Sequence, residues 1–136
     1  VIIGAAADAD ALLPGIVRSI QGRIASELMF DRIAEMTPTL QTAGDSGFAP
    51  RLAQSWTWSN DSLRLTLRFD PRATWHDGRP VRSSDYAFAL RLVRDPALAS
   101  SLAADVASID SIAIPDSLTA VIHFGSRDAE QFYAAT

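Results

Sequence analysis

The chain has 136 residues, of which 48% are hydrophobic and 21% are charged, so it has the composition of a folded domain and not of a disordered segment. Its formal net charge of −4 gives no electrostatic support for binding a phosphate backbone, and we expect no nucleic-acid partner. The absence of cysteine excludes disulfides, thiolate metal sites and a cysteine nucleophile. No apolar run reaches the roughly 20 residues that a membrane helix needs, so we expect no membrane insertion.

The first part of the chain predicts a strand, a loop and a helix. Residues 1–6 form a short apolar run that is typical of a buried strand, and residues 7–15 leave it through Asp, Pro and Gly. A helical repeat of apolar residues then predicts a helix over about residues 17–30. The apolar stripe on this helix consists of Ile20, Ile24 and Leu28.

The middle of the chain predicts a loop followed by a β-hairpin. Residues 37–50 are rich in Gly and Pro and predict a loop or an irregular hairpin tip. Residues 55–58 and 63–69 flank a turn at 59–62, and the second of these strands alternates strictly between apolar and polar side chains. This period of two predicts an antiparallel hairpin with one solvated face. The apolar set is Leu63, Leu65, Leu67 and Phe69.

A tight turn and a second helix follow the hairpin. Residues 75–78, Trp-His-Asp-Gly, end in a dipeptide that supplies the positive φ of such a turn, so Gly78 is expected there. Ser83 or Ser84 can cap the next helix, and Asp85 in its first turn suits the helix dipole. The apolar side of this helix carries Ala87, Leu90 and Val93, and Asp95-Pro96 stops it.

The last part of the chain predicts a second hairpin between two helical segments. Residues 97–104 predict a short helix, residues 108–114 and 118–124 flank a turn, and residues 128–135 open as another helix. The fold class is therefore α+β, with a mixed, mostly antiparallel sheet, hairpins and two to three helices.

Few side chains in this sequence suit catalysis. His76 and Asp77 are adjacent, but the turn chemistry of Asp-Gly accounts for them without a proton-transfer role. His76 and His123 have no carboxylate at ligand spacing and make a weak case for a metal. Asp8 and Asp10 are a carboxylate pair, but a glycosidase would also need a pocket and partners. We therefore expect no catalytic residue, no metal ligand and no cofactor.

The three tryptophans could form a stacking platform for a ligand. At strand spacing, however, such residues more often bury large apolar areas in a core. We therefore expect Trp56 and Trp75 to be substantially buried.

Five short motifs follow one another in residues 52–95. They are Leu52-Ala53-Gln54-Ser55-Trp56, Asn60-Asp61, Leu67-Arg68, Trp75-His76-Asp77-Gly78 and Ser84-Asp85-Tyr86-Ala87-Phe88. Their order and spacing resemble family 5 of the bacterial extracellular solute-binding proteins, which are receptors for dipeptides, oligopeptides and nickel. The resemblance extends more loosely to both ends, although Leu12-Leu13-Pro14 replaces the Leu-Asp-Pro that is frequent in that family.

The resemblance implies a lobe of the type 2 periplasmic-binding-protein fold. Family members are several times longer and close two lobes on a ligand, so residues 1–136 are expected to be the N-terminal part of lobe one, trimmed from a longer protein. The loop after the first strand borders the ligand cleft in such receptors. The candidate ligand-binding residues are Asp8, Ala9, Asp10 and Ala11.

The function that the resemblance implies is that of a binding module and not of an enzyme. Such a receptor binds peptides or similar small solutes in the periplasm or outside the cell and delivers them to the permease subunits of an ABC importer. The alternative is a ligand-sensing domain of a cytoplasmic transcriptional regulator with the same fold. A leader peptide upstream would favour the receptor, and a helix-turn-helix there would favour the regulator.

Overall fold

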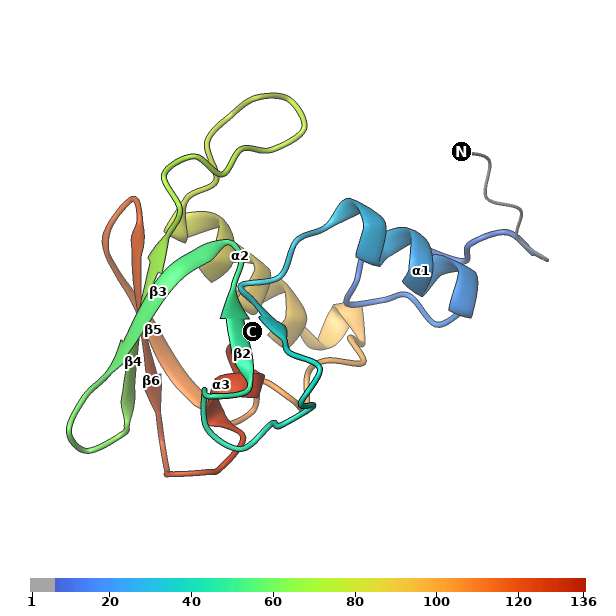
Figure 1. The fold of residues 1–136 in the computed structure, drawn as a ribbon. Coiled ribbons are helices and arrows are strands. Elements are labelled where there is room, and N and C mark those ends of the chain that lie inside the picture. Colours follow the sequence, from blue (N-terminus) through green and yellow to red (C-terminus); the bar gives the residue numbers. More distant parts are fainter. Residues whose placement is uncertain (1–6) are drawn as a thin grey trace.

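The computed structural model describes residues 7–136, and the strand expected at residues 1–6 lies outside the described residues. Within this range there are three α-helices, one 3₁₀ turn and two antiparallel sheets, which confirms the α+β class (Figure 1). The helices are α1 (Ile20–Met29), α2 (Ser83–Arg94) and α3 (Gln131–Ala134), with η1 (Pro96–Leu98) after α2. The strands are β1 (Ala34–Met36), β2 (Phe48–Pro50), β3 (Ala53–Trp58), β4 (Arg64–Phe69), β5 (Ile109–Asp116) and β6 (Thr119–Phe124).

The larger sheet has the strand order β3-β4-β6-β5 and is built from the two predicted hairpins. In β4 the expected alternation is confirmed, because Leu65 and Leu67 are fully buried while Arg64 and Arg68 are exposed. The hairpins join where β4 pairs with β6, which places Leu65 opposite Ile122. One face of the sheet is thus apolar and carries the core, and the other face is solvated.

Helix α2 packs on the apolar face of this sheet. Its side towards the core carries Ala87 and Leu90, both buried as expected. The expected cap is wrong, since Arg82 is the N-cap and its backbone N–H donates to Asp85 Oδ2 at 3.0 Å. Ser83 is instead the first helical residue, and its hydroxyl donates to the carbonyl of Asp116 at 2.6 Å. This bond ties the start of the helix to the β5–β6 turn.

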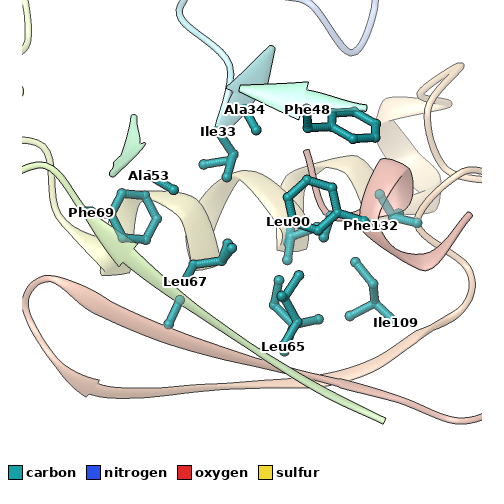
Figure 2. Close-up of a cluster of buried hydrophobic side chains, with 14 of the residues drawn as sticks. Ile33, Ala34, Phe48, Ala53, Leu65, Leu67, Phe69, Leu90, Ile109 and Phe132 are labelled. Atoms are coloured by element: carbon teal, nitrogen blue, oxygen red, sulfur yellow. The ribbon is translucent and has the colours of Figure 1, made fainter. Parts of the chain in front are cut away.

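The core lies between the larger sheet, α2 and the small β1–β2 sheet (Figure 2). Phe132 of α3 is fully buried there. Its ring centroid lies 4.9 Å from that of Phe48 and 4.7 Å from that of Trp56. Trp58 adds a third aromatic contact at 6.4 Å. The C-terminal helix therefore fills the space between the two sheets with one ring.

Several element boundaries differ from the sequence-based expectation. The segment 37–50 was expected to be a loop or an irregular hairpin tip, and it is such a tip: it connects β1 to β2, which pair antiparallel, and its last three residues form β2. The helix expected at 97–104 is limited to η1, and the remainder forms turns. The helix expected at 128–135 covers only α3. Short elements of three or four residues are fixed by tertiary contacts, so local pattern does not mark their ends.

The apolar stripe of α1 does not face the core. The helix exists at the expected place, but its apolar stripe points outward: Ile20 and Leu28 are each 71% exposed and Ile24 is 51% exposed. The buried face carries Gly22 and Ser26 instead. In Figure 1, α1 lies to one side of the body and does not cover the larger sheet. Within the described residues the stripe therefore does not pack on the core.

Candidate functional site

The loop that precedes α1 contains the four residues expected to contact a ligand. Asp8, Ala9 and Asp10 are exposed and Ala11 is half-buried. The carboxylate of Asp10 accepts hydrogen bonds from the backbone N–H of Arg18 at 2.9 Å and from that of Ser19 at 3.1 Å. It also accepts from the Ser19 hydroxyl. Asp10 therefore holds the loop against the two residues that directly precede α1.

The bonds to Asp10 also fix its charge. The Ser19 hydroxyl, and then the backbone N–H groups of Arg18 and Ser19, lower the pKa of Asp10 from 3.8 to about 2. Ser19 in turn is the N-cap of α1, where its Oγ accepts from the backbone N–H of Gly22 at 3.0 Å. Loop and helix are thus joined through one carboxylate and one hydroxyl.

A close backbone approach holds the same loop against α1. A Cβ added to Gly22 would lie 2.7 Å from both the carbonyl oxygen of Ala11 and Oδ1 of Asp10, and it would also clash with Val17. Only glycine leaves room for this contact. The loop is therefore pre-shaped, with Asp8 and Ala9 on its exposed side.

A cleft of about 510 Å³ opens at the other end of α1. Its walls are the last residues of α1 and the segment after it, the loop that carries Trp75 and His76, and the start of α2. The apolar lining includes Leu28, Phe30, Trp75 and Tyr86. Its volume lies within the range of small-molecule sites, roughly 300–1,000 Å³.

Trp75 forms the rim of this cleft and is 39% exposed, so the expectation of substantial burial is wrong for it. The loop of residues 71–82 projects from the body (Figure 1). The indole of Trp75 reaches the first turn of α2, where its Nε1 donates to Asp85 Oδ2 at 3.0 Å. Trp56, by contrast, is half-buried against Phe132.

The Asp77-Gly78 turn at the tip of this loop is a structural feature, as expected. Gly78 has φ +83°, and its N–H donates to the carbonyl of Trp75 at 2.9 Å. The backbone N–H and then the guanidinium of Arg79 lower the pKa of Asp77 below its ordinary value. Asp77 is therefore held ionised by its neighbour.

The two histidines lie on different elements. His76 is exposed on the projecting loop, whereas His123 is half-buried on β6 opposite Arg64. In residues 7–136 no group of three or more His, Cys, Asp or Glu side chains is placed to hold a metal ion. No helix in the same range combines the length and the apolar character that crossing a bilayer requires.

The sequence interpretation missed the role of Asp45. Its Oδ2 accepts hydrogen bonds from two indoles, Trp56 Nε1 at 2.9 Å and Trp58 Nε1 at 3.2 Å. The same loop is tied to the end of the chain, because Gly44 N–H donates to the carbonyl of Ala129 at 2.7 Å. Within the sequence, Gly-Asp-Ser-Gly indicates only a turn, and nothing local links it to the tryptophans.

The structure does not bring the ligand-loop residues and the cleft together. The loop lies at the N-terminal end of α1 and the cleft at its C-terminal end, and a ten-residue helix is about 15 Å long. A second hollow, of about 440 Å³, lies beside Trp58 and Phe132 and is also not lined by the loop. The described residues thus present three separate candidate surfaces: the loop, the cleft and this second hollow.

Comparison with known proteins gives a family match over most of the chain. The profile of the bacterial extracellular solute-binding proteins, family 5 Middle, matches residues 47–136. A Brucella ovis protein named "Putative ABC transporter peptide-binding protein" is 42% identical over 71 residues, which cover 52% of this chain and 13% of that protein.

Two solved structures show the same fold. MoaA from A. tumefaciens R10, in complex with mannopinic acid, matches with a TM-score of 0.81 and 25% identity, covering 93% of this chain and 25% of that one. NikZ from Campylobacter jejuni, in complex with Ni(L-His), matches with a TM-score of 0.78 and 20% identity, covering 95% of this chain and 24% of that one. These likenesses confirm the periplasmic-binding-protein fold, and the matched residues span 13% of the Brucella protein and about a quarter of each of these two solved chains.

Proposed function

Since this chain belongs to family 5 of the bacterial extracellular solute-binding proteins, we propose that the intact protein is the substrate-binding component of an ABC importer. The observation that carries this proposal is the family match over residues 47–136. The intact protein captures a small solute outside the cytoplasmic membrane and delivers it to permease subunits. Capture is a closure of two lobes around the ligand, driven by contacts made only in the closed state. No covalent step is involved.

In this proposal residues 1–136 form the N-terminal part of the first lobe. The matches over 93% and 95% of this chain, and about a quarter of each solved chain, support its being one part of a longer binding protein. A single lobe offers one wall of a site, whereas useful affinity for a drug-sized ligand needs roughly 70% or more of its surface buried. The isolated chain is therefore expected to bind its solute orders of magnitude more weakly than the intact protein does.

The solute class is a peptide or a similar small molecule. The Brucella relative carries a peptide-binding name, and the two structural relatives are complexes with mannopinic acid and Ni(L-His). The family relationship thus supports a small polar solute, and titration must determine which chemical class it belongs to. A panel of peptides, opines and metal–amino-acid complexes covers these chemistries.

The wall that this chain contributes is the loop of Asp8, Ala9, Asp10 and Ala11. The bonds that Asp10 makes to Ser19 pre-shape the loop, which reduces the entropy that a ligand must offset on binding. Asp8 is exposed beside it and carries the charge that a ligand's amino group would meet.

Calorimetric titration of the intact protein with this panel tests the proposal. At least one member is expected to bind with a Kd of about 1 μM or tighter, and the 136-residue chain alone is expected to bind it far more weakly. Asp8→Ala should weaken binding while Asp110→Ala, an exposed aspartate on β5, should not. If no member binds the intact protein, the function is wrong. If Asp8→Ala binds like the parent protein, the assignment of the loop is wrong.

A further inference from the structure

The tip of the projecting loop at residues 71–82 holds a chemically reactive dipeptide (Figure 1). Asp77 is the only aspartate in the sequence that a glycine follows. Because glycine has no Cβ, its backbone nitrogen is open to attack on the carboxyl group of the residue before it. Both residues are exposed, and no atom of a non-neighbouring residue lies within 4 Å of the position that a Cβ of Gly78 would occupy.

The reaction open to this dipeptide is an intramolecular condensation. The backbone nitrogen of Gly78 attacks Cγ of the protonated Asp77 side chain, and a bond forms between these two atoms. The bond from Cγ to its hydroxyl oxygen breaks, and the hydroxyl leaves with the amide proton as one water molecule. One water then opens the resulting cyclic succinimide at either carbonyl. It returns aspartate, or it gives isoaspartate, in which the backbone runs through Cβ and Cγ and the former main-chain carbonyl carbon becomes a carboxylate.

Contacts in the folded loop oppose this condensation at both of its reacting groups. The Gly78 N–H donates to the carbonyl of Trp75 at 2.9 Å, so the nitrogen is engaged elsewhere. The carboxylate of Asp77 accepts from the backbone N–H of Arg79 at 3.0 Å and from its Nε at 2.7 Å. These two bonds, in that order, lower the pKa of Asp77, and only a protonated carboxyl group can lose its hydroxyl as water. The fold thus keeps the carboxyl group ionised and held away from the nitrogen.

The same turn positions the rim of the cleft. The Trp75 backbone N–H donates to the carbonyl of Arg79 at 2.8 Å, and its indole Nε1 donates to Asp85 Oδ2 at 3.0 Å. Isoaspartate at position 77 adds a methylene carbon to the backbone between these two ends of the turn. The pairing of Trp75 with Arg79 then no longer fits, and the indole loses its support. A chemical change at the exposed tip therefore reaches the wall of the cleft.

We propose that Asp77 is a site of isoaspartate formation and that the guanidinium of Arg79 slows this reaction in the folded protein. The backbone N–H of Arg79 contributes as well, but every residue except proline supplies it at this position. The guanidinium is the part that depends on the arginine side chain, which is 79% exposed and has no place in the core. The inference is independent of the proposed function, since it needs only the folded loop.

Incubation of the intact protein in heavy-oxygen water measures the reaction. Each ring opening adds one solvent oxygen to the peptide that contains residue 77, whichever product forms, so mass spectrometry after digestion in ordinary water counts every event. Arg79→Ala removes the guanidinium and keeps the backbone N–H. We expect it to take up label at least about threefold faster than the parent, which is the scale of an exposed ion pair. Arg79→Gln replaces it if circular dichroism shows that Arg79→Ala does not fold.

A second clamp on the same loop provides the matched control. Arg72 holds Asp70 in the same way, with its backbone N–H at 2.9 Å and its Nη2 at 2.7 Å from the carboxylate. Pro71 has no N–H, so Asp70 cannot follow this route. Arg72→Ala is therefore expected to leave the uptake at Asp77 unchanged.

The parent protein unfolded in urea is the reference for an unprotected dipeptide, and we expect it to take up label fastest. If folded Arg79→Ala reacts no faster than the folded parent while the unfolded reference reacts, the turn alone protects Asp77 and the inference is overturned. It is also overturned if Arg72→Ala accelerates uptake as much as Arg79→Ala does, because protection would then belong to the rigidity of the whole loop. An unlabelled unfolded reference would show that Asp77 is not a site of this reaction at all.

Discussion

Replacing Phe132 by alanine removes the ring at the centre of the aromatic cluster. The ring is fully buried and packs against Phe48 at 4.9 Å and Trp56 at 4.7 Å. It belongs to a helix of only four residues, so little besides the ring holds that helix in place. The substitution therefore tests whether α3 is an integral part of the core.

The expected cost follows from burial and from ring contacts. Truncation of a buried Phe to Ala costs about 3–5 kcal/mol through lost transfer energy and the cavity left behind. Aromatic pairs at these distances contribute about 0.5–1.5 kcal/mol each beyond burial, which favours the upper half of that range. We expect a loss of about 4 kcal/mol in the free energy of unfolding. Domains of this kind have about 5–15 kcal/mol in total, so the variant should remain folded but marginal.

Urea unfolding followed by tryptophan fluorescence measures this loss, since Trp56 and Trp58 both contact the ring. With a urea dependence of about 2 kcal/mol per molar, the midpoint should fall by about 2 M. Tyr133→Ala is the matched control, because that side chain is 40% exposed on the same helix and its loss should change little. A loss below about 1 kcal/mol for Phe132→Ala would show that α3 is not docked in solution.

Three further substitutions test the loops. Asp45→Ala leaves two indole N–H groups without their acceptor and should lower the free energy of unfolding in urea by about 1–3 kcal/mol, and Asp45→Asn should lower it by less. If both variants are as stable as the parent, water replaces the carboxylate. Gly22→Ala brings a Cβ to 2.7 Å from the carbonyl of Ala11 and should cost about 1–3 kcal/mol, so an unchanged melting temperature would contradict the close approach. Because Ser19 lowers the pKa of Asp10 from 3.8 to about 2, the ionised carboxylate stabilises the fold fully above its unfolded pKa and loses this effect as pH falls through about 2. The difference in unfolding free energy between the parent and Asp10→Asn should therefore shrink between pH 6 and pH 2, and a constant difference would refute this role.

The hairpins could be predicted from sequence because their signal is local and repeated. Alternation along β4 places Leu65 and Leu67 on one face and Arg64 and Arg68 on the other, whatever the rest of the chain does. Turn chemistry is equally local, as Gly78 shows with its positive φ. The family motifs lie in this same region.

The direction in which α1 presents its stripe could not be predicted. An apolar period of 3.6 residues shows that a helix has an apolar side, but the neighbour of that side is a property of the whole protein. The predicted burial of Trp75 was wrong for a related reason: the size of the side chain favours burial, but its loop projects beyond the core. Asp45 was missed because its two indole partners are 11 and 13 residues away and no periodicity links them.

The loop around Asp45 depends on contacts that are distant along the chain. The hydroxyl of Thr42 donates to Glu130 at 3.0 Å across 88 residues of sequence, and Phe132 completes the same region. Forming contacts between residues so far apart in sequence requires closing a long loop, which costs entropy and slows folding. A nascent chain that ends before Phe132 therefore leaves Phe48 and the neighbouring indoles open to solvent. Until Phe132 emerges from the ribosome, this half of the core is a natural binding surface for chaperones that keep a polypeptide unfolded.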